Sequence, residues 1–260
     1  MNPNAAAEER YYYRIRRLII EMNREVYAEI EKLYRQPVAQ EYFAQDATMS
    51  AQAKQLMEAL AYKFQRIFNI ASIPLATTMA AEQSKASATT LQASLKELSA
   101  GLTLKTDILT GELKDILQAT IAENVSLIKS IPSEYFTDIK GAVYRSITTG
   151  NGLQDLVPFL QKHEGVTLRR ARTIARDQTN KAFTNINTAR MEKIGIKQYE
   201  WLHSAGGQKP RKLHVRYSGR IFDIANPPVI DEKTGQRGKP GDLVNCRCRM
   251  VPVLNFNTGE

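Results

Sequence analysis

The chain contains two cysteines, Cys246 and Cys248, which are separated by one residue in the segment NCRC. Thiolates and imidazoles are the ligands that zinc prefers, so His203 and His214 would complete a four-ligand set with this pair. The spacing argues against zinc, because zinc-binding cysteines are usually about two to four residues apart. A cysteine nucleophile with His214 as its base, oriented by Asn245, is a second possibility. We favour a third interpretation, in which both thiols are small buried apolar side chains.

A strand through the cysteine pair would place alternate side chains on opposite faces. We therefore expect Cys246, Cys248 and Met250 to point into the protein. The expected outward side holds Asn245, Arg247 and Arg249. In an extended strand the two cysteine Cα atoms are ~6.6 Å apart, which is the outer limit for a disulfide, so no disulfide is expected.

A basic ridge is expected on the long helix predicted for residues 166–194. Its members are Arg169, Arg172 and Arg176, which follow at steps of three and four residues and so share a helical face. Such a ridge suits contact with phosphates or with an acidic partner. A solvated face with an ion pair to Asp177 explains the same spacing, so both interpretations stay open.

Positive charge is concentrated in the C-terminal half of this 260-residue chain. Residues 140–260 contain 21 Lys and Arg against 10 Asp and Glu, a net charge of +11. Residues 1–139 contain 15 against 17, a net charge of −2. This split suggests that a polyanion or an acidic partner meets the C-terminal half. No apolar run is long enough for a membrane-spanning segment, and two cysteines are too few for a disulfide scaffold, which indicates assembly in a reducing cytoplasm.

Hydrophobic periodicity predicts helices over most of the first 150 residues. The apolar spacing stops near Pro37 and again before Pro74, and a new helix is expected to begin at Pro132, because proline disfavours helix in the preceding residue. Residues 76–100 contain 15 Ala, Ser or Thr. We expect this segment to be a long, partly packed helix that leans on another chain, since it has little apolar surface to bury.

After residue 152 the pattern changes to a short helix at 153–165 and a long helix at 166–194, with Gly195 as its C-cap residue. Three short β-like runs follow, QYEWL, GRIFDI and CRMVPVL. The predicted fold class is therefore α+β: a mostly α-helical N-terminal region, followed by a compact α+β module with a small β-sheet. The boundary is expected near residues 148–152, and Trp201 is expected to anchor the core of the module.

Several blocks of the C-terminal half occur in a recognisable order. They are RARTIARDQTNKAFTNINTARMEKIGIKQYEW, KPRKLHVRYSGRIF, NPPVID and PGDLVNCRCRMVPVL. Over residues 150–255 this order resembles the Mu F-like minor head proteins, a family of phage head morphogenesis proteins. The motif residues that carry the resemblance are Trp201, Arg211, His214, Gly219, Pro240, Gly241, Asn245, Cys246 and Cys248. Many relatives carry an acidic residue shortly before the R-x-x-H element, where this chain has Gly207-Gln208-Lys209-Pro210.

The resemblance implies a non-enzymatic minor capsid protein of a tailed bacteriophage, located inside the virion head near the portal. It implies a role in head assembly and in DNA packaging or ejection. The implied partners are the portal protein, the major capsid or scaffolding protein, and double-stranded DNA. We expect residues 1–148 to dock to the portal and residues 150–256 to form the head morphogenesis module. The residues expected to contact DNA or a partner are Arg169, Arg172, Arg176, Arg247 and Arg249.

Two other classes of function remain open from the sequence. A cytoplasmic nucleic-acid-binding protein would use the same basic half without any role in the virion. A zinc- or cysteine-dependent enzyme would use the cysteines and histidines. No cofactor is expected under the favoured interpretation, and zinc is the alternative.

Overall fold

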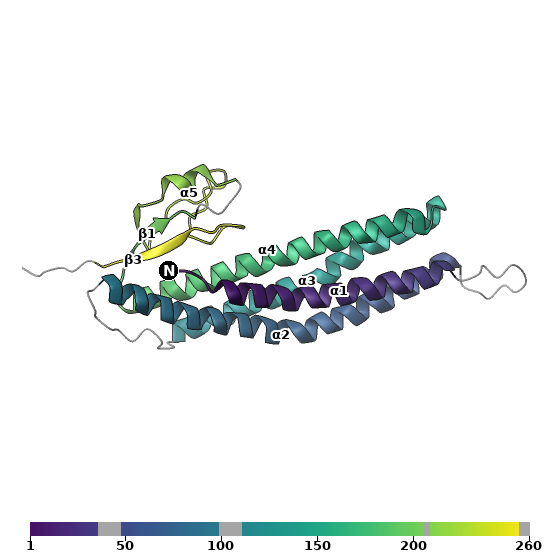
Figure 1. The fold of residues 1–260 in the computed structure, drawn as a ribbon, viewed down its shortest axis with the longest axis horizontal. Coiled ribbons are helices and arrows are strands. Elements are labelled where there is room, and N and C mark those ends of the chain that lie inside the picture. Colours follow the sequence, from purple (N-terminus) through teal and green to yellow (C-terminus); the bar gives the residue numbers. More distant parts are fainter. Residues whose placement is uncertain (36–47, 99–110, 205–208, 255–260) are drawn as a thin grey trace, which may run out of the picture. The chain divides into compact units, whose positions relative to one another are not determined.

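The computed structural model describes residues 1–35, 48–98, 111–204 and 209–254. Four long helices come first along the chain: α1 (Ala5–Arg35), α2 (Met49–Leu98), α3 (Gly111–Thr149) and α4 (Leu153–Lys193). They are followed by β1 (Gln198–Leu202), α5 (Lys212–Arg216), β2 (Ile221–Asp223) and β3 (Arg249–Val253). Figure 1 shows these elements in chain order. The expected α+β class, with a helical N-terminal region and a small sheet, is confirmed.

The chain forms two compact units, and each unit draws on separated segments. Unit 1 consists of Met1–Arg10, Ala76–Glu123 and Thr173–Glu260, and unit 2 consists of Tyr11–Leu75 and Asn124–Arg172. The long helices α1 to α4 therefore each contribute to both units. The expected division of labour between residues 1–148 and residues 150–256 stays a prediction.

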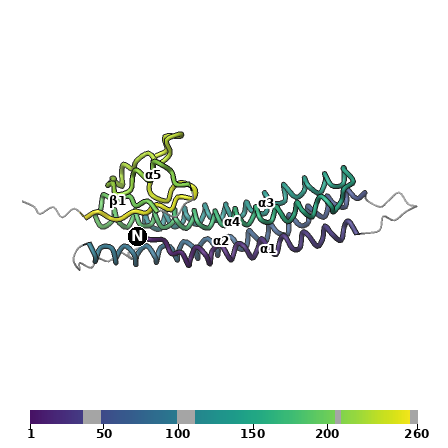
Figure 2. The backbone as a smooth tube through the Cα atoms, turned by 45° about the horizontal axis from the view of Figure 1, so that its top comes forward, coloured from purple at the N-terminus to yellow at the C-terminus, as the bar shows by residue number. Residues whose placement is uncertain are grey.

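Unit 2 is a bundle in which parts of α1, α2, α3 and α4 run side by side (Figure 2). The predicted periodic face of α1 is buried, and polar groups within the bundle are paired. The Tyr11 hydroxyl donates to Asn124 at 2.9 Å, and the Tyr135 hydroxyl donates to Asn23 at 2.8 Å. Among the described residues, none of the helices has the length and apolar character required to cross a lipid bilayer.

Two of the predicted helix boundaries are wrong, because α2 continues through Pro74 and α3 continues through Pro132. A proline inside a helix costs about 3 kcal/mol. Each buried large apolar side chain contributes ~1.5–3 kcal/mol, and the helix on both sides of each proline carries such side chains. They are Phe68 and Leu75 around Pro74, and Ile131 and Phe136 around Pro132. The packing of both flanks therefore outweighs the lost hydrogen bond.

The predicted break between residues 165 and 166 is also wrong, since α4 runs without interruption from Leu153 to Lys193. Its end is as expected: Gly195 has a φ of 83°, a left-handed conformation that glycine adopts without strain. The segment 76–98 is the second half of α2, and it packs within its own chain. Ser87 is fully buried and donates to Asn187 of α4 at 2.7 Å, so small and polar side chains replace apolar ones at this contact.

The sheet of unit 1 has the strand order β2-β1-β3, with both neighbours antiparallel to β1. Trp201 pairs with Met250 across β1 and β3, and both side chains are buried in one apolar cluster. Leu91 and Leu95 of α2 and Met191 of α4 belong to the same cluster. Trp201 therefore anchors the core of the module, as expected, and that core is shared with the ends of two long helices.

Candidate functional site

Both cysteines and two of the three histidines of the chain meet at one point in unit 1. The Nδ1 atom of His214 lies 3.5 Å from the Cys246 sulfur and 3.6 Å from the Cys248 sulfur. The Nδ1 atom of His203 lies 3.5 Å from the Cys248 sulfur. Both thiols are free and buried. His214 is buried as well, at 3% exposure. These are the four residues that the sequence proposed as a zinc set.

Three separate segments position these side chains. His203 directly follows β1, His214 lies in α5, and the cysteines lie in the loop that precedes β3. The prediction of a strand through the cysteines is thus wrong, because β3 begins only at Arg249. The predicted alternation of inward and outward side chains nevertheless holds. Cys246, Cys248 and Met250 are buried, whereas Arg247 and Arg249 are exposed.

The turn before the cysteines depends on two residues with positive φ. Asn245 has a φ of 60°, a conformation that asparagine tolerates better than most residues. Gly241 has a φ of 99°, and a Cβ atom at this position would lie 3.0 Å from the Thr184 hydroxyl. Glycine is therefore required at position 241 both by its backbone conformation and by the close approach of α4.

A polar stripe on α4 binds the backbone of this turn. Asp177 accepts a hydrogen bond from the Asn245 N–H at 2.7 Å, and Asn180 donates to the Cys246 carbonyl at 3.1 Å. Thr184 donates to the Pro240 carbonyl at 2.8 Å. The apolar and basic faces predicted for this helix do not include Asn180 and Thr184. Asp177, Asn180 and Thr184 recur at steps of three and four residues, which is the signal that would have identified the stripe.

The motif residues around the cluster have structural roles that the contacts make plain. Arg211 donates to the Val244 carbonyl at 3.0 Å, so the R-x-x-H element touches the NCRC turn through both its arginine and its histidine. Gly219 has a φ of 80° and donates its N–H to the Trp201 carbonyl at 2.8 Å. This bond closes the connection between β1 and β2.

The two cysteine thiols influence each other's pKa in opposite directions. The hydrogen bond with the Cys248 thiol is the largest influence on Cys246 and lowers its pKa, burial raises it, and the contact with His214 lowers it further. The same interaction with Cys246, together with burial, raises the pKa of Cys248 well above its ordinary value.

A small hollow of about 50 Å³ opens beside this cluster. Its cationic lining consists of Lys209, Arg211 and Arg247, and His203, His214 and Cys248 also contribute to its wall. The chemistry available at this point is metal ligation within the cluster and anion contact at its rim. The exposed Arg247 and Arg249 were predicted to contact DNA or a partner, and that role stays a prediction.

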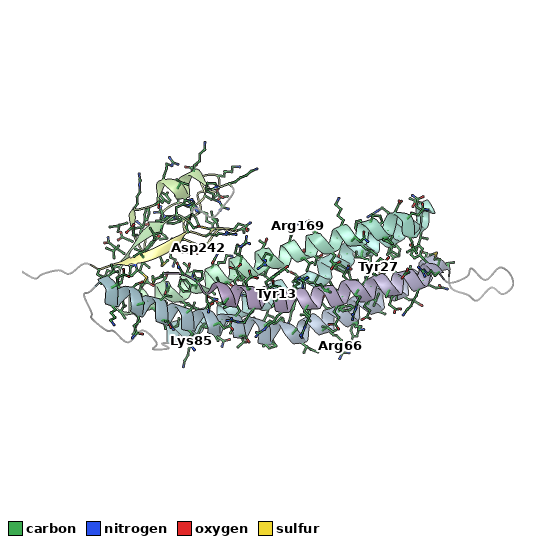
Figure 3. All side chains as sticks on the ribbon, viewed as in Figure 1. Tyr13, Tyr27, Arg66, Lys85, Arg169 and Asp242 are labelled. Atoms are coloured by element: carbon green, nitrogen blue, oxygen red, sulfur yellow. The ribbon has the colours of Figure 1, made fainter. Side chains whose placement is uncertain are left out.

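Arg172 and Arg176 of the predicted basic ridge on α4 make contacts within the chain. The Arg172 guanidinium lies over the Tyr12 ring, 3.8 Å from its centroid, within unit 2. Arg176 lies 3.8 Å from the Glu8 carboxylate and donates to Asn245 at 3.4 Å, within unit 1. Arg169 is exposed (Figure 3). A role of the three arginines in binding DNA or a partner stays a prediction.

Residues 137–251 match the family model described as Phage Mu protein F like protein. An uncharacterized protein of Haemophilus influenzae (strain ATCC 51907 / DSM 11121 / KW20 / Rd) is 37% identical over 141 residues, which cover 54% of this chain and 30% of that protein. The matched part thus spans less than a third of that relative. No solved structure matches the chain.

The family match contains all of α4, the R-x-x-H element and the four residues of the His–Cys cluster. The resemblance noted in the sequence is thereby confirmed, and phage head morphogenesis is the function that this family suggests. Residues 137–251, somewhat less than half of the chain, are thus similar to the Phage Mu F-like family.

Proposed function

We propose that this protein is a non-enzymatic minor head protein of a tailed bacteriophage, which associates with the portal and with the DNA inside the head. The observation that carries the proposal is the family match over residues 137–251. The charge of the chain supports it, because an excess of positive charge in residues 140–260 suits a component that meets packaged DNA.

The DNA-facing surface is assigned to the exposed arginines that flank Cys248, namely Arg247 and Arg249. They project from the outward side of the segment whose inward side carries the buried thiols. Arginine binds phosphate with two parallel hydrogen bonds, and each phosphate contact contributes about 0.9 to the slope of log affinity against log salt. Binding by this surface is therefore expected to be independent of sequence and to weaken steeply with salt.

The portal-facing surface is assigned to α2 in unit 2. Ile70 is 73% exposed, Ile73 is 59% exposed and Tyr62 is 66% exposed. Large apolar side chains that gather on one exposed helical segment are typical of a protein interface. This assignment agrees with the −2 charge of residues 1–139, which is unsuited to binding DNA.

Point substitutions in the full chain test both surfaces, because a truncation near residue 148 would remove segments from both compact units. Ile70→Asp with Ile73→Asp is expected to abolish binding to the purified portal ring. The control is Leu98→Asp, which changes another exposed apolar residue of α2. Duplex DNA binding should be unchanged in all of these variants.

The second arm of the experiment measures DNA affinity across a salt series. Arg247→Gln with Arg249→Gln is expected to lower the log–log slope by about 2. Arg172→Gln with Arg176→Gln is the matched control and should change the slope less, because these arginines already contact Tyr12 and Glu8. Tight DNA binding without any affinity for the portal would instead support a cytoplasmic nucleic-acid-binding protein and contradict the proposal.

A further inference from the structure

We propose that His203, His214, Cys246 and Cys248 bind one Zn²⁺ ion in a closed structural site. The cluster brings together two thiols and two imidazoles from three segments that are distant along the chain. The ligand atoms of His214, Cys246 and Cys248 all lie within 4.8 Å of one another, and each of these residues is buried.

The distances in the cluster agree with tetrahedral zinc. Zinc–sulfur bonds of about 2.3 Å and zinc–nitrogen bonds of about 2.0–2.1 Å at the tetrahedral angle separate a ligand sulfur from a ligand nitrogen by roughly 3.6 Å. The three sulfur–nitrogen distances here are 3.5, 3.6 and 3.5 Å. His214 therefore already has the separations from both sulfurs that one shared zinc ion would impose, and His203 has such a separation from the Cys248 sulfur.

Hydrogen bonds alone do not account for the position of His214. Its Nε2 atom lies 3.1 Å from the Ile230 carbonyl, which only accepts, so Nε2 carries the proton and Nδ1 has one lone pair. That lone pair can accept one S–H donor, yet two sulfurs lie at almost equal distances from it. A metal ion at this point satisfies Nδ1 and both sulfurs together. The bond to Ile230 is the outer contact that typically orients a zinc-binding histidine.

The surroundings of the sulfurs are rich in N–H donors, which suit thiolate ligands. The backbone N–H groups of Gly241 and Cys248 are directed at the Cys246 sulfur. The backbone N–H of Ser204 is directed at the Cys248 sulfur. The buried indole N–H of Trp201 lies in the same apolar cluster and has no hydrogen-bond partner among the described residues. Two neutral thiols packed as apolar groups would not need these donors.

The spacing of the cysteines does not oppose this site. Cys246 and Cys248 lie in an extended segment, so both side chains point inward and reach the same imidazole. The two histidines then complete the set from the end of β1 and from α5. Zinc would thus join three segments of a module whose strands are only five, three and five residues long. Because the apolar core of such a module is small, a bound metal would contribute much of its stability.

The test is the metal content and the cobalt spectrum of the full-length protein purified under reducing conditions. We expect about one zinc per chain, and cobalt substitution should produce the charge-transfer band of cobalt–thiolate bonds together with a tetrahedral ligand-field spectrum. Cys248→Ser and His214→Gln should each lower the zinc content at least tenfold. The matched control is His163→Gln, because His163 is the third histidine and lies in unit 2.

A measurement on the unsubstituted chain covers the case in which these variants fail to fold. A strong chelator should lower the melting temperature, and added zinc should restore it. The proposal is overturned if the purified protein contains no zinc and takes up no cobalt. It is equally overturned if zinc is retained by both Cys248→Ser and His214→Gln, since the metal would then lie elsewhere.

Discussion

Replacing Gly241 by alanine should destabilise unit 1 more than a glycine substitution normally does. A residue other than glycine held at positive φ costs about 1–3 kcal/mol, and a φ of 99° lies beyond the usual left-handed region, so the upper part of this range applies. The new methyl group would also lie 3.0 Å from the Thr184 hydroxyl and disturb its bond to the Pro240 carbonyl, which is worth about 1 kcal/mol. The expected loss is about 3 kcal/mol.

Gly235→Ala is the matched control for this substitution. Gly235 also has a positive φ, of 70°, but a Cβ atom there would meet nothing within 4 Å. Only the backbone cost of about 1 kcal/mol should appear. The difference of about 2 kcal/mol between the two variants then measures the unusual φ and the approach of α4 to the turn.

Urea unfolding followed by tryptophan fluorescence is a suitable assay, because Trp201 is the only tryptophan and lies in the core of the same module. In a Thr184→Ala background, Gly241→Ala should cost about 1 kcal/mol less, since the hydroxyl that the methyl group would meet is gone. Equal losses for Gly241→Ala and Gly235→Ala would refute the reasoning. If Gly241→Ala costs the same free energy of unfolding with and without Thr184→Ala, Thr184 contributes nothing to the requirement for glycine at position 241.

Three further predictions concern other sites. Trp201→Phe removes the indole ring whose centroid lies 5.1 Å from that of His214 and should weaken zinc binding about tenfold in a competition with a chromophoric chelator, whereas unchanged affinity would show that this ring contact does not orient His214. Burial lowers the pKa of His163 and Asp138 opposes this, so the unfolded chain binds the proton more tightly. Stability should fall as pH drops below about 6.5, and His163→Gln should flatten this dependence in circular dichroism melts. Asn180→Ala should destabilise the module by about 1 kcal/mol in urea unfolding, because the Cys246 carbonyl loses its donor, and an unchanged midpoint would contradict this role.

The fold was predictable where apolar periodicity is strong and unpredictable where packing overrides a local rule. The buried face of α1 follows directly from spacing, and the strands QYEWL and RMVPV occur where β-like runs were expected. Pro74 and Pro132 do not end their helices, because the sequence does not show how much apolar surface is buried on both sides of each proline. The second half of α2 was expected to need another chain, whereas Ser87 finds a polar partner in α4.

The candidate site was predictable in part, and the limit was distance along the chain. Alternation correctly placed Cys246, Cys248 and Met250 on one inward side. His214 lies 32 residues before Cys246, and His203 lies 45 residues before Cys248, so only the fold brings their side chains to the sulfurs. The sequence therefore named the four residues but contained no local signal that they meet.

The short spacing of the cysteine pair was the main reason to doubt a metal, and the structure shows that this spacing still leaves both sulfurs beside His214. A spacing of two to four residues is needed when both cysteines lie in one tight turn that wraps around the metal. In this chain the turn comes just before the pair: Asn245 and Gly241 adopt positive φ, and α4 holds the turn through Asp177 and Thr184. Cys246 and Cys248 are then free to be extended, so a one-residue spacer puts both sulfurs on the same side. The motif residues PG and NCRC thus act as one unit. The first part bends the chain onto α4, and the second places two sulfurs beside the imidazole rings of His203 and His214.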